Sequence, residues 1–251
     1  MRPNPLIIGN WKMHGSTSQA RELAEYFRGQ VLKQELKAEV VLCPAFPYLT
    51  LVAHYLVGTT LKLGGQDCHT QVEGAYTGDV SAAMLSDLGC AYVICGHSER
   101  RSQHQESDVI VKAKAEAAHK AGLISVICIG ENQHQRDKGR TLEVLYEQVK
   151  GSLPATATSK NTVFAYEPLW AIGTGTAARA QDVNVVFKFL QQQIKQQIPE
   201  DALIRLLYGG SVTPDNVNEF LQMNIVNGVL VGGVSLKAQD FWALVTHSFA
   251  C

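Results

Sequence analysis

The sequence predicts an α/β fold, a closed (βα)8 barrel whose eight parallel strands lie inside a ring of helices. Eight short apolar runs are spread along the chain, and the spacing leaves room for a helix after each one. The length of 251 residues agrees with the roughly 250 residues that such a barrel needs. No Pro/Gly/Ser-rich linker or change of composition divides the chain, so residues 1–251 are expected to form one domain. An open, doubly wound sheet is the alternative, but it typically uses fewer strands.

The predicted strands are rich in β-branched residues, and several are continuously apolar instead of alternating. Continuous apolar runs are typical of parallel strands that are covered on both faces. The eight runs are Leu6–Ile8, Val40–Leu42, Leu61–Leu63, Tyr92–Cys95, Ile124–Ile129, Val163–Tyr166, Ile204–Tyr208 and Val229–Val231.

Helical periodicity is clearest in three segments between these runs. The apolar stripes are Ala20, Leu23, Ala24, Phe27 and Val31; Leu142, Leu145, Tyr146 and Val149; and Val183, Val186, Phe187, Leu190, Ile194 and Ile198. Ser16 and Gln19 can form a capping box before the first stripe, and Pro199 ends the third. Thr213-Pro214 predicts an N-cap with proline at the first helical position. The segments after the second, third and eighth strands show weaker periodicity.

Composition favours a folded protein of the reducing cytoplasm. Hydrophobic residues make up 46% and charged residues 18%, so a large core can be buried. The net charge of −1 indicates neither a nucleic acid nor an anionic membrane as a partner, and no apolar run approaches a membrane span. The first apolar run is too short for a signal peptide. The six cysteines are scattered without a Cys-x-x-Cys pair, so no metal site is expected.

Polar and glycine residues cluster where the predicted strands end. In a parallel barrel all carboxyl ends meet at one rim, so residues about 160 positions apart should converge on one mouth. The segments concerned are Gly9-Asn10-Trp11-Lys12, Gly96-His97-Ser98-Glu99, Glu167, Gly209-Gly210-Ser211 and Gly232-Gly233.

Four of these residues are candidates for chemistry, and a fifth, Glu99, is a candidate for support. Partial burial of Glu167 would raise its basicity, although a rim carboxylate paired with a cation is an equal alternative. His97 precedes a predicted helix start, where backbone N–H groups disfavour imidazolium, so it could donate a hydrogen bond as a neutral ring. Lys12 could stabilise an oxyanion and Asn10 could donate to a substrate oxygen. Glu99 is expected to pair with a cation and support the site.

The two glycine pairs, Gly209-Gly210 (followed by Ser211) and Gly232-Gly233, predict a phosphate site. Glycine lets backbone N–H groups approach an anion closely, and barrels commonly hold phosphate after strands seven and eight. One pair alone would be read more simply as a turn.

The long segment Pro168-Leu169-Trp170-Ala171-Ile172-Gly173-Thr174-Gly175-Thr176-Ala177 predicts a lid that closes over a ligand. It also matches a loose dinucleotide fingerprint, but the match lies too far from the strand and lacks the acidic residue.

Other charged residues receive plainer interpretations. Arg100 and Arg101 are predicted to be solvated or to lie at an interface. The remaining histidines are interpreted as ordinary satisfied polar residues, namely His14, His54, His69, His104, His119, His134 and His247.

In combination these segments resemble the triosephosphate isomerase family, whose members fold as TIM barrels. The motifs occur in family order across nearly the whole chain, and the long one around Glu167 is highly specific. The matching motifs are Gly9-Asn10-Trp11-Lys12-Met13, Gly96-His97-Ser98-Glu99-Arg100-Arg101, Cys128-Ile129-Gly130-Glu131, Tyr166 to Gly175, Tyr208-Gly209-Gly210-Ser211-Val212 and Leu230-Val231-Gly232-Gly233.

The resemblance implies the interconversion of dihydroxyacetone phosphate and glyceraldehyde 3-phosphate in glycolysis and gluconeogenesis, without metal or cofactor. It implies Glu167 as the base and His97 as the electrophile that moves a proton between the enediolate oxygens. Lys12 and Asn10 would hold the substrate. Backbone N–H groups for the phosphate would come from Gly173, Ser211, Gly232 and Gly233.

The resemblance also implies a homodimer in which the loop Gly74–Asp79 of one subunit reaches its partner. Thr77 would lie nearest the neighbouring active site, and Tyr76 and His14 would belong to the interface. Departures from the commonest family pattern are His14, Tyr76, Asp79, Asn227 and Val234.

Three alternatives are weaker. Another barrel enzyme acting on a phosphorylated substrate could be a different aldose–ketose isomerase or an aldolase-like lyase. A Schiff-base lyase needs a desolvated lysine, and only Lys12 and Lys62 lie near strand positions. A nicotinamide oxidoreductase is opposed by the poor fingerprint, and a non-catalytic scaffold would not need Asn10, Lys12, His97 and Glu167 together.

Overall fold

The structure is a computed structural model that describes residues 4–172, 178–198 and 204–247. Eight strands form a closed barrel in sequence order, and every neighbouring pair is parallel. The predicted fold class is therefore confirmed. The strands are β1 (Leu6–Asn10), β2 (Glu39–Cys43), β3 (Lys62–Gly65), β4 (Cys90–Cys95), β5 (Ile124–Ile129), β6 (Thr162–Tyr166), β7 (Arg205–Tyr208) and β8 (Gly228–Val231).

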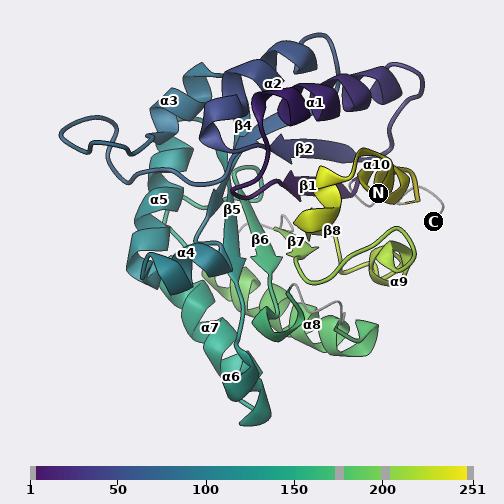
Figure 1. The fold of residues 1–251 in the computed structure, drawn as a ribbon. Helices are drawn as coiled ribbons and strands as arrows, with labels where there is room; N and C mark the ends of the chain where they lie inside the picture. The colour runs from purple at the N-terminus through teal and green to yellow at the C-terminus, as the bar shows by residue number, and fades with distance from the viewer. Residues whose placement is uncertain (1–3, 173–177, 199–203, 248–251) are drawn as a thin grey trace.

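Helices surround the strands, and the loop before α3 projects from the body (Figure 1). The α-helices are α1 (Thr17–Val31), α2 (Leu49–Leu56), α3 (Ala82–Asp87), α4 (Ser98–Gln103), α5 (Asp108–Lys120), α6 (Gln133–Asp137), α7 (Thr141–Ser152), α8 (Ala180–Gln197), α9 (Val217–Leu221) and α10 (Ala238–His247). Short 3-10 helices are η1 (Phe46–Tyr48), η2 (Leu169–Ala171) and η3 (Gly233–Leu236).

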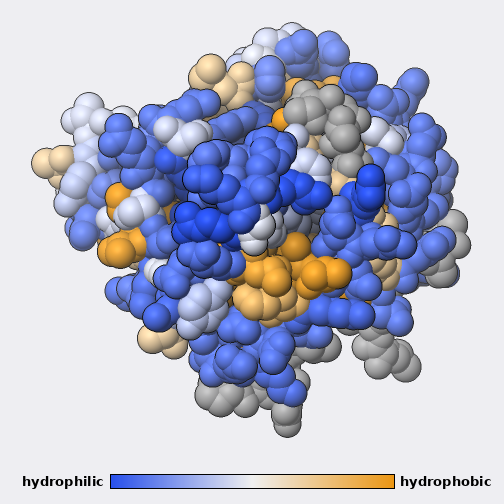
Figure 2. All heavy atoms as spheres, turned by 90° about the horizontal axis from the view of Figure 1, so that it is seen from below, coloured by the Kyte–Doolittle hydropathy of each residue, from blue (hydrophilic) through white to orange (hydrophobic). Residues whose placement is uncertain are grey.

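Two apolar layers explain why the strands read as continuous apolar runs. One layer fills the inside of the barrel and the other lies between the strands and the helices, so most strand residues are buried on both faces. All five residues of β1 and of β6 are buried. The face seen from below is mostly hydrophilic, and its most prominent hydrophobic cluster lies near the middle (Figure 2).

The barrel closes where β8 pairs with β1. Gly228 is the register partner of Leu6 and has a φ of +154°, a conformation that other residues rarely adopt. A Cβ atom at Gly228 would lie 1.9 Å from the backbone oxygen of Leu6. The last strand therefore needs glycine to approach the first.

Helix starts agree with the sequence in one case and differ in another. Ser16 caps α1 by accepting a hydrogen bond from the backbone N–H of Gln19 at 3.3 Å. The helix predicted to start at Thr213-Pro214 begins instead at Val217. The Asn216 side chain accepts from the backbone N–H of Thr213 at 2.8 Å and donates to the Ser211 carbonyl, which stabilises a turn ahead of α9.

Candidate active site

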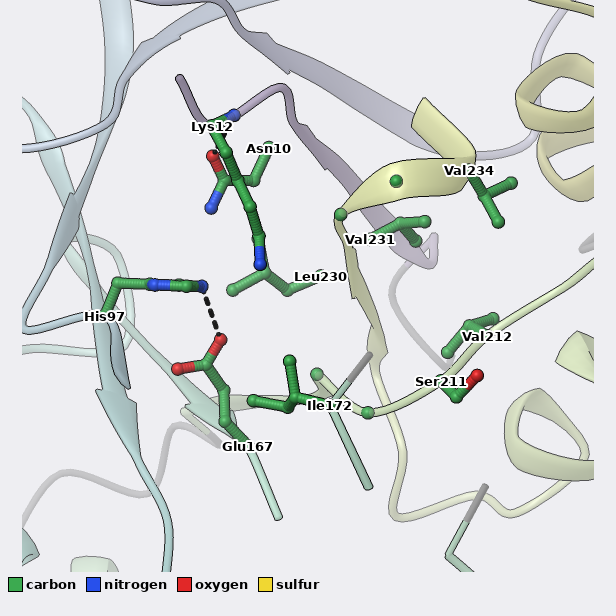
Figure 3. A pocket seen from close by; sticks show the side chains of 14 residues that line it. Asn10, Lys12, His97, Glu167, Ile172, Ser211, Val212, Leu230, Val231 and Val234 are labelled. Atoms are coloured by element: carbon green, nitrogen blue, oxygen red, sulfur yellow. Dashed lines mark hydrogen bonds and ion pairs between the residues drawn. The ribbon is translucent and has the colours of Figure 1, made fainter. Parts of the chain in front are cut away.

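The carboxyl ends of the strands surround a cavity of about 230 Å³. Its walls combine polar side chains from β1, the loop after β4 and the loop after β6 with glycines that follow β7 and β8 (Figure 3). The lining residues are Asn10, Lys12, His97, Glu167, Ile172, Gly209, Gly210, Ser211, Val212, Leu230, Val231, Gly232, Gly233 and Val234. The structure thus brings together most of the candidate residues that the sequence suggested.

Glu167 is the first residue after β6 and is buried, with 2% of its surface exposed. Its backbone N–H donates to the carbonyl of Ile129 at 2.7 Å, which prolongs the ladder between β5 and β6. One carboxylate oxygen lies 3.0 Å from Nε2 of His97, and the other accepts the backbone N–H of Ser98 at 3.0 Å. The carboxylate therefore faces the start of α4 across the cavity.

His97 is the N-cap of α4 and is also buried. Its Nδ1 accepts the backbone N–H of Glu99 at 3.3 Å, so this nitrogen carries no proton. The ring proton then resides on Nε2, which points at Glu167. A neutral imidazole with its proton on Nε2 can make both hydrogen bonds.

The electrostatics of this pair differ from the sequence-based expectation for Glu167. Burial favours the neutral carboxylic acid, but His97, the Ser98 N–H and Lys12 outweigh it and lower the pKa of Glu167. Burial likewise opposes the charged form of His97, but the Glu167 carboxylate outweighs it and raises the pKa of His97. Burial acts on Glu167 in the expected direction, but the close polar partners outweigh it, so the net effect is a lower pKa. The carboxylate is ionised at neutral pH.

Lys12 is held by its neighbours in a left-handed backbone conformation, with a φ of 54°. Its backbone N–H donates to Oδ1 of Asn10 at 3.0 Å, and its carbonyl accepts from Gln66 at 2.9 Å. Nζ lies 2.6 Å from Glu99, which is half exposed and lies outside the cavity. Figure 3 shows the Lys12 side chain extending into the cavity beside Asn10. Since Asn10 uses Oδ1 on Lys12, its amide nitrogen remains to serve as a donor.

The glycines that follow β7 and β8 line the same cavity, and Gly209 lies against Glu167, since a Cβ atom there would lie 2.8 Å from Cγ of Glu167. A Cβ atom at Gly232 would lie 3.2 Å from Cε of Lys12, so a larger residue there would crowd the lysine. Of the predicted lid, Pro168–Ile172 is described, with η2 over Leu169–Ala171 and Ile172 in the cavity wall. Gly173, Thr174, Gly175, Thr176 and Ala177 lie outside the described residues.

Arg100 and Arg101, which were expected to be solvated or to lie at an interface, are only partly exposed and form ion pairs within the chain. Arg101 donates to the carbonyls of Gly96 and Cys128 and pairs with Asp108 at 2.6 Å. Arg100 forms ion pairs with Asp67 at 2.8 Å and with Glu106 at 2.5 Å. Charge patterning alone cannot tell such buried pairs from solvated ones, because the partners lie elsewhere in the sequence.

The apolar part of the cavity was also missed. Leu230, Val212 and Val234 line it together with Ile172. Their positions in or shortly after β7 and β8, at the same rim as the polar candidates, could have identified them as lining residues. Lys62, by contrast, is exposed and lies outside the cavity, which removes it as a Schiff-base candidate.

The predicted interface residues do not line this cavity. His14 lines a second hollow of about 400 Å³, which shares Asn10, Lys12 and His97 with the first. Tyr76 and Thr77 are exposed on the projecting loop.

The described residues do not meet the requirements of a metal site or of a membrane-spanning helix. Within the described residues, no group of three or more His, Cys, Asp and Glu side chains is arranged to hold a metal ion. No helix in that part of the chain combines the length and the hydrophobicity needed to cross a membrane.

The fold and the cavity together define a (βα)8-barrel enzyme whose mouth holds a carboxylate–imidazole pair, a lysine and two glycine pairs. The family model for triosephosphate isomerase matches residues 5–248. The chain belongs to the triosephosphate isomerase family.

Individual relatives agree across nearly the whole length. A triosephosphate isomerase of Chelativorans sp. (strain BNC1) is 49% identical over 241 residues, which are 96% of this chain and 95% of that protein. One of Rhodopseudomonas palustris (strain BisA53) is 48% identical over 242 residues, or 95% of each chain. The crystal structure of triosephosphate isomerase from Bartonella henselae is 42% identical and superposes with a TM-score of 0.89, covering 99% of this chain and 100% of that one.

Proposed function

We propose that Glu167 is the base and His97 the proton donor in the reaction of this enzyme, the interconversion of dihydroxyacetone phosphate and glyceraldehyde 3-phosphate. The observation that carries these roles is the 3.0 Å contact between the buried carboxylate and Nε2 of His97, in a cavity that also contains Lys12. Glu167 removes a proton from one substrate carbon and returns it to the adjacent carbon. The intermediate is an enediolate.

The protonation states suit these roles. Glu167 must begin as a carboxylate, and the lowered pKa keeps it ionised at neutral pH. His97 must donate from Nε2, which is the nitrogen that carries the proton when Nδ1 accepts from Glu99. Substrate must take the place of the mutual hydrogen bond, so that the carboxylate reaches carbon and the imidazole reaches oxygen.

The remaining roles follow from charge and backbone shape. Lys12 and the amide of Asn10 stabilise the negative oxygen, because fixed donors in a partly dry cavity act without reorganisation. Backbone N–H groups of Ser211, Gly232, Gly233 and Gly173 bind the phosphate. The segment Pro168–Ala177 closes over the substrate and excludes water.

The base assignment is tested by Glu167→Asp. Withdrawing the carboxylate by about one methylene misplaces it, so kcat should fall by about 10²-fold or more while KM changes little. Glu167→Gln, which has the length but no basicity, should be at least as impaired. Turnover of Glu167→Asp close to that of the unchanged enzyme would exclude Glu167 as the base.

The reaction needs no added cofactor in our proposal. A coupled assay that starts from glyceraldehyde 3-phosphate should give the same rate with and without a chelator. Loss of activity on chelation, or a requirement for a nicotinamide, would contradict this.

We further propose that two copies of the chain form a homodimer through the face around His14. Met13 on this face is 94% exposed, and the adjoining 400 Å³ hollow opens beside Lys12 and His97. The loop that bears Tyr76 and Thr77 projects from the body of the barrel (Figure 1), and in the proposed dimer it enters this hollow on the second copy. Sedimentation equilibrium should give twice the 27.4 kDa chain mass. A single 27.4 kDa species at all concentrations would contradict the dimer.

We also propose the cytoplasm as its compartment. The five cysteines in the described part of the chain are buried free thiols, which a reducing environment preserves. Cell fractionation with a cytosolic marker tests this.

A further inference from the structure

We propose that His69 is a positioning residue that holds the projecting loop, residues 70–80, in the shape that enters the second subunit. The inference rests on the proposed dimer and deepens it. In the sequence His69 looked like an ordinary polar residue, and none of the roles assigned above uses it.

The loop has little structure of its own. Residues 71–79 are all exposed, and the loop joins β3 to α3 without a strand or helix. Loops without buried side chains sample many conformations, and ordering them on association costs free energy. A contact that orders the loop beforehand would therefore strengthen the dimer.

His69 lies at the neck of this loop, where its two ends meet. Its backbone N–H donates to the carbonyl of Val80 at 2.8 Å, and it forms an isolated parallel bridge with Ser81. The side chain turns toward the loop and is 23% exposed. The His69 side chain is thus half-buried at the neck, from where it can reach the exposed loop residues.

The imidazole contacts the loop on its outgoing limb, near its tip and on its return. Nδ1 accepts the backbone N–H of Gln71 at 3.1 Å. The ring lies against the ring of Tyr76, with centroids 4.2 Å apart and planes tilted by 38°. Nε2 lies 3.7 Å from the Asp79 carboxylate. One side chain therefore connects three points of the loop.

Tyr76 in turn restrains the residues at the tip of the loop. Its ring also packs over Gly74, where a Cβ atom would lie 3.0 Å from the ring. Its backbone N–H donates to the carbonyl of Gly74, and its own carbonyl accepts from Asp79, both at 3.0 Å. Thr77 lies next to this braced tyrosine. The residue expected nearest the partner's active site is thereby held by a histidine that is eight positions away.

Substitutions at position 69 can separate the hydrogen bond to Gln71 from the ring contact with Tyr76. Asparagine at position 69 could still accept from Gln71 N–H but has no ring for Tyr76. Phenylalanine could pack against Tyr76 but cannot accept a hydrogen bond. His69→Ala removes both contacts, and His134→Ala, on α6 and away from the loop in Figure 1, serves as a control.

Two measurements test the proposal, namely dimer dissociation on dilution and chymotrypsin cleavage after Tyr76. His69→Ala should raise the dimer dissociation constant by about tenfold or more and speed cleavage. His69→Asn and His69→Phe should each recover part of the loss. At protein concentrations that keep the dimer intact, kcat of all variants should stay close to that of the unchanged enzyme, because the acid–base pair is untouched. Far-ultraviolet circular dichroism verifies that each variant is folded.

The outcomes separate this proposal from the dimer itself. Unchanged dissociation and cleavage in His69→Ala would overturn the role of His69. An unchanged enzyme that is monomeric at every concentration would overturn the dimer, while cleavage would still report whether His69 orders the loop. Equal effects in His134→Ala would also overturn the proposal, since the loss would not be specific to the loop.

Discussion

The backbone of Glu167 packs directly against Gly130, which has no side chain. A Cβ atom at Gly130 would lie 1.8 Å from the backbone oxygen of Glu167 and 2.8 Å from the Leu169 side chain. Backbone hydrogen bonds lie on either side, since Glu167 N–H donates to the Ile129 carbonyl at 2.7 Å and Leu169 N–H donates to the Glu131 carbonyl at 3.0 Å. Glu167 is thus fixed by backbone contact between neighbouring segments as well as by the contacts of its own side chain.

Gly130→Ala should therefore move the base. The methyl group cannot fit without shifting the backbone at Glu167, and a displacement of about 1 Å can reduce catalysis by about 10²-fold. We expect kcat/KM to fall by that order in a steady-state assay. Gly29→Ala is the matched control, because a Cβ there meets nothing within 4 Å and should leave kcat/KM unaltered. Comparable activity in the two variants would contradict this account of Gly130.

At the scale of elements, the segment after β6 is anchored at both ends. Glu131 accepts hydrogen bonds from the Trp170 indole at 2.9 Å and from the Tyr166 hydroxyl at 3.2 Å. The Arg136 guanidinium lies 3.9 Å above the Trp170 ring. At the far end, the backbone N–H of Ala178 donates to the hydroxyl of Tyr208 at 3.0 Å. The two ends of the proposed lid are thereby fixed to β5, α6 and β7.

Shortening the segment between Trp170 and Ala177 should uncouple proton removal from isomerisation. A lid that cannot reach the substrate leaves the enediolate phosphate exposed, and elimination then yields inorganic phosphate and methylglyoxal. Both products can be measured beside residual isomerase activity. The same deletion combined with Glu167→Gln should give neither, because no enediolate forms. Full isomerisation without methylglyoxal would exclude the lid role.

At the scale of the whole molecule, a polar cluster links strands across the amino end of the barrel. Arg205 on β7 donates to Glu39 on β2 and to the Tyr92 hydroxyl on β4, both at 2.7 Å. Tyr92 donates to Glu39 at 2.7 Å, so the three side chains close a triangle. Arg205 and Glu39 are partly buried, with 18% and 31% of their side chains exposed. The cluster joins strands that are not neighbours in the sheet.

Arg205→Met should destabilise the fold by about 2 kcal/mol, because Glu39 and Tyr92 lose a charged partner in a partly buried place. Urea unfolding at neutral pH measures this as a lower midpoint. Arg140→Met offers a control, since Arg140 and its partner Glu143 are both exposed and such pairs contribute little. An unaltered midpoint for Arg205→Met would show that the cluster is not stabilising.

Some features could be predicted because they depend on local pattern. The apolar run around Val163 reads as a strand because it is covered on both faces, and Ser16 begins a helix because its side chain caps the backbone three residues on. Thr213 was misplaced because the decisive group, the Asn216 side chain, folds back on the turn. Arg101 was misjudged because its partners include a carbonyl on β5, 27 residues away.

The sequence by itself determined the barrel, because apolar strand runs are a local signal. It also determined which residues meet at the mouth, because parallel strands bring their carboxyl ends to one rim. The family followed from motifs in the same segments. Only the tertiary structure decided that Glu167 and His97 lie in contact, and that the partners of Glu167 lower its pKa in spite of its burial. The pKa of a buried group depends on partners brought from other strands, and the brace of His69 on Tyr76 likewise exists only once the loop has folded back on its neck.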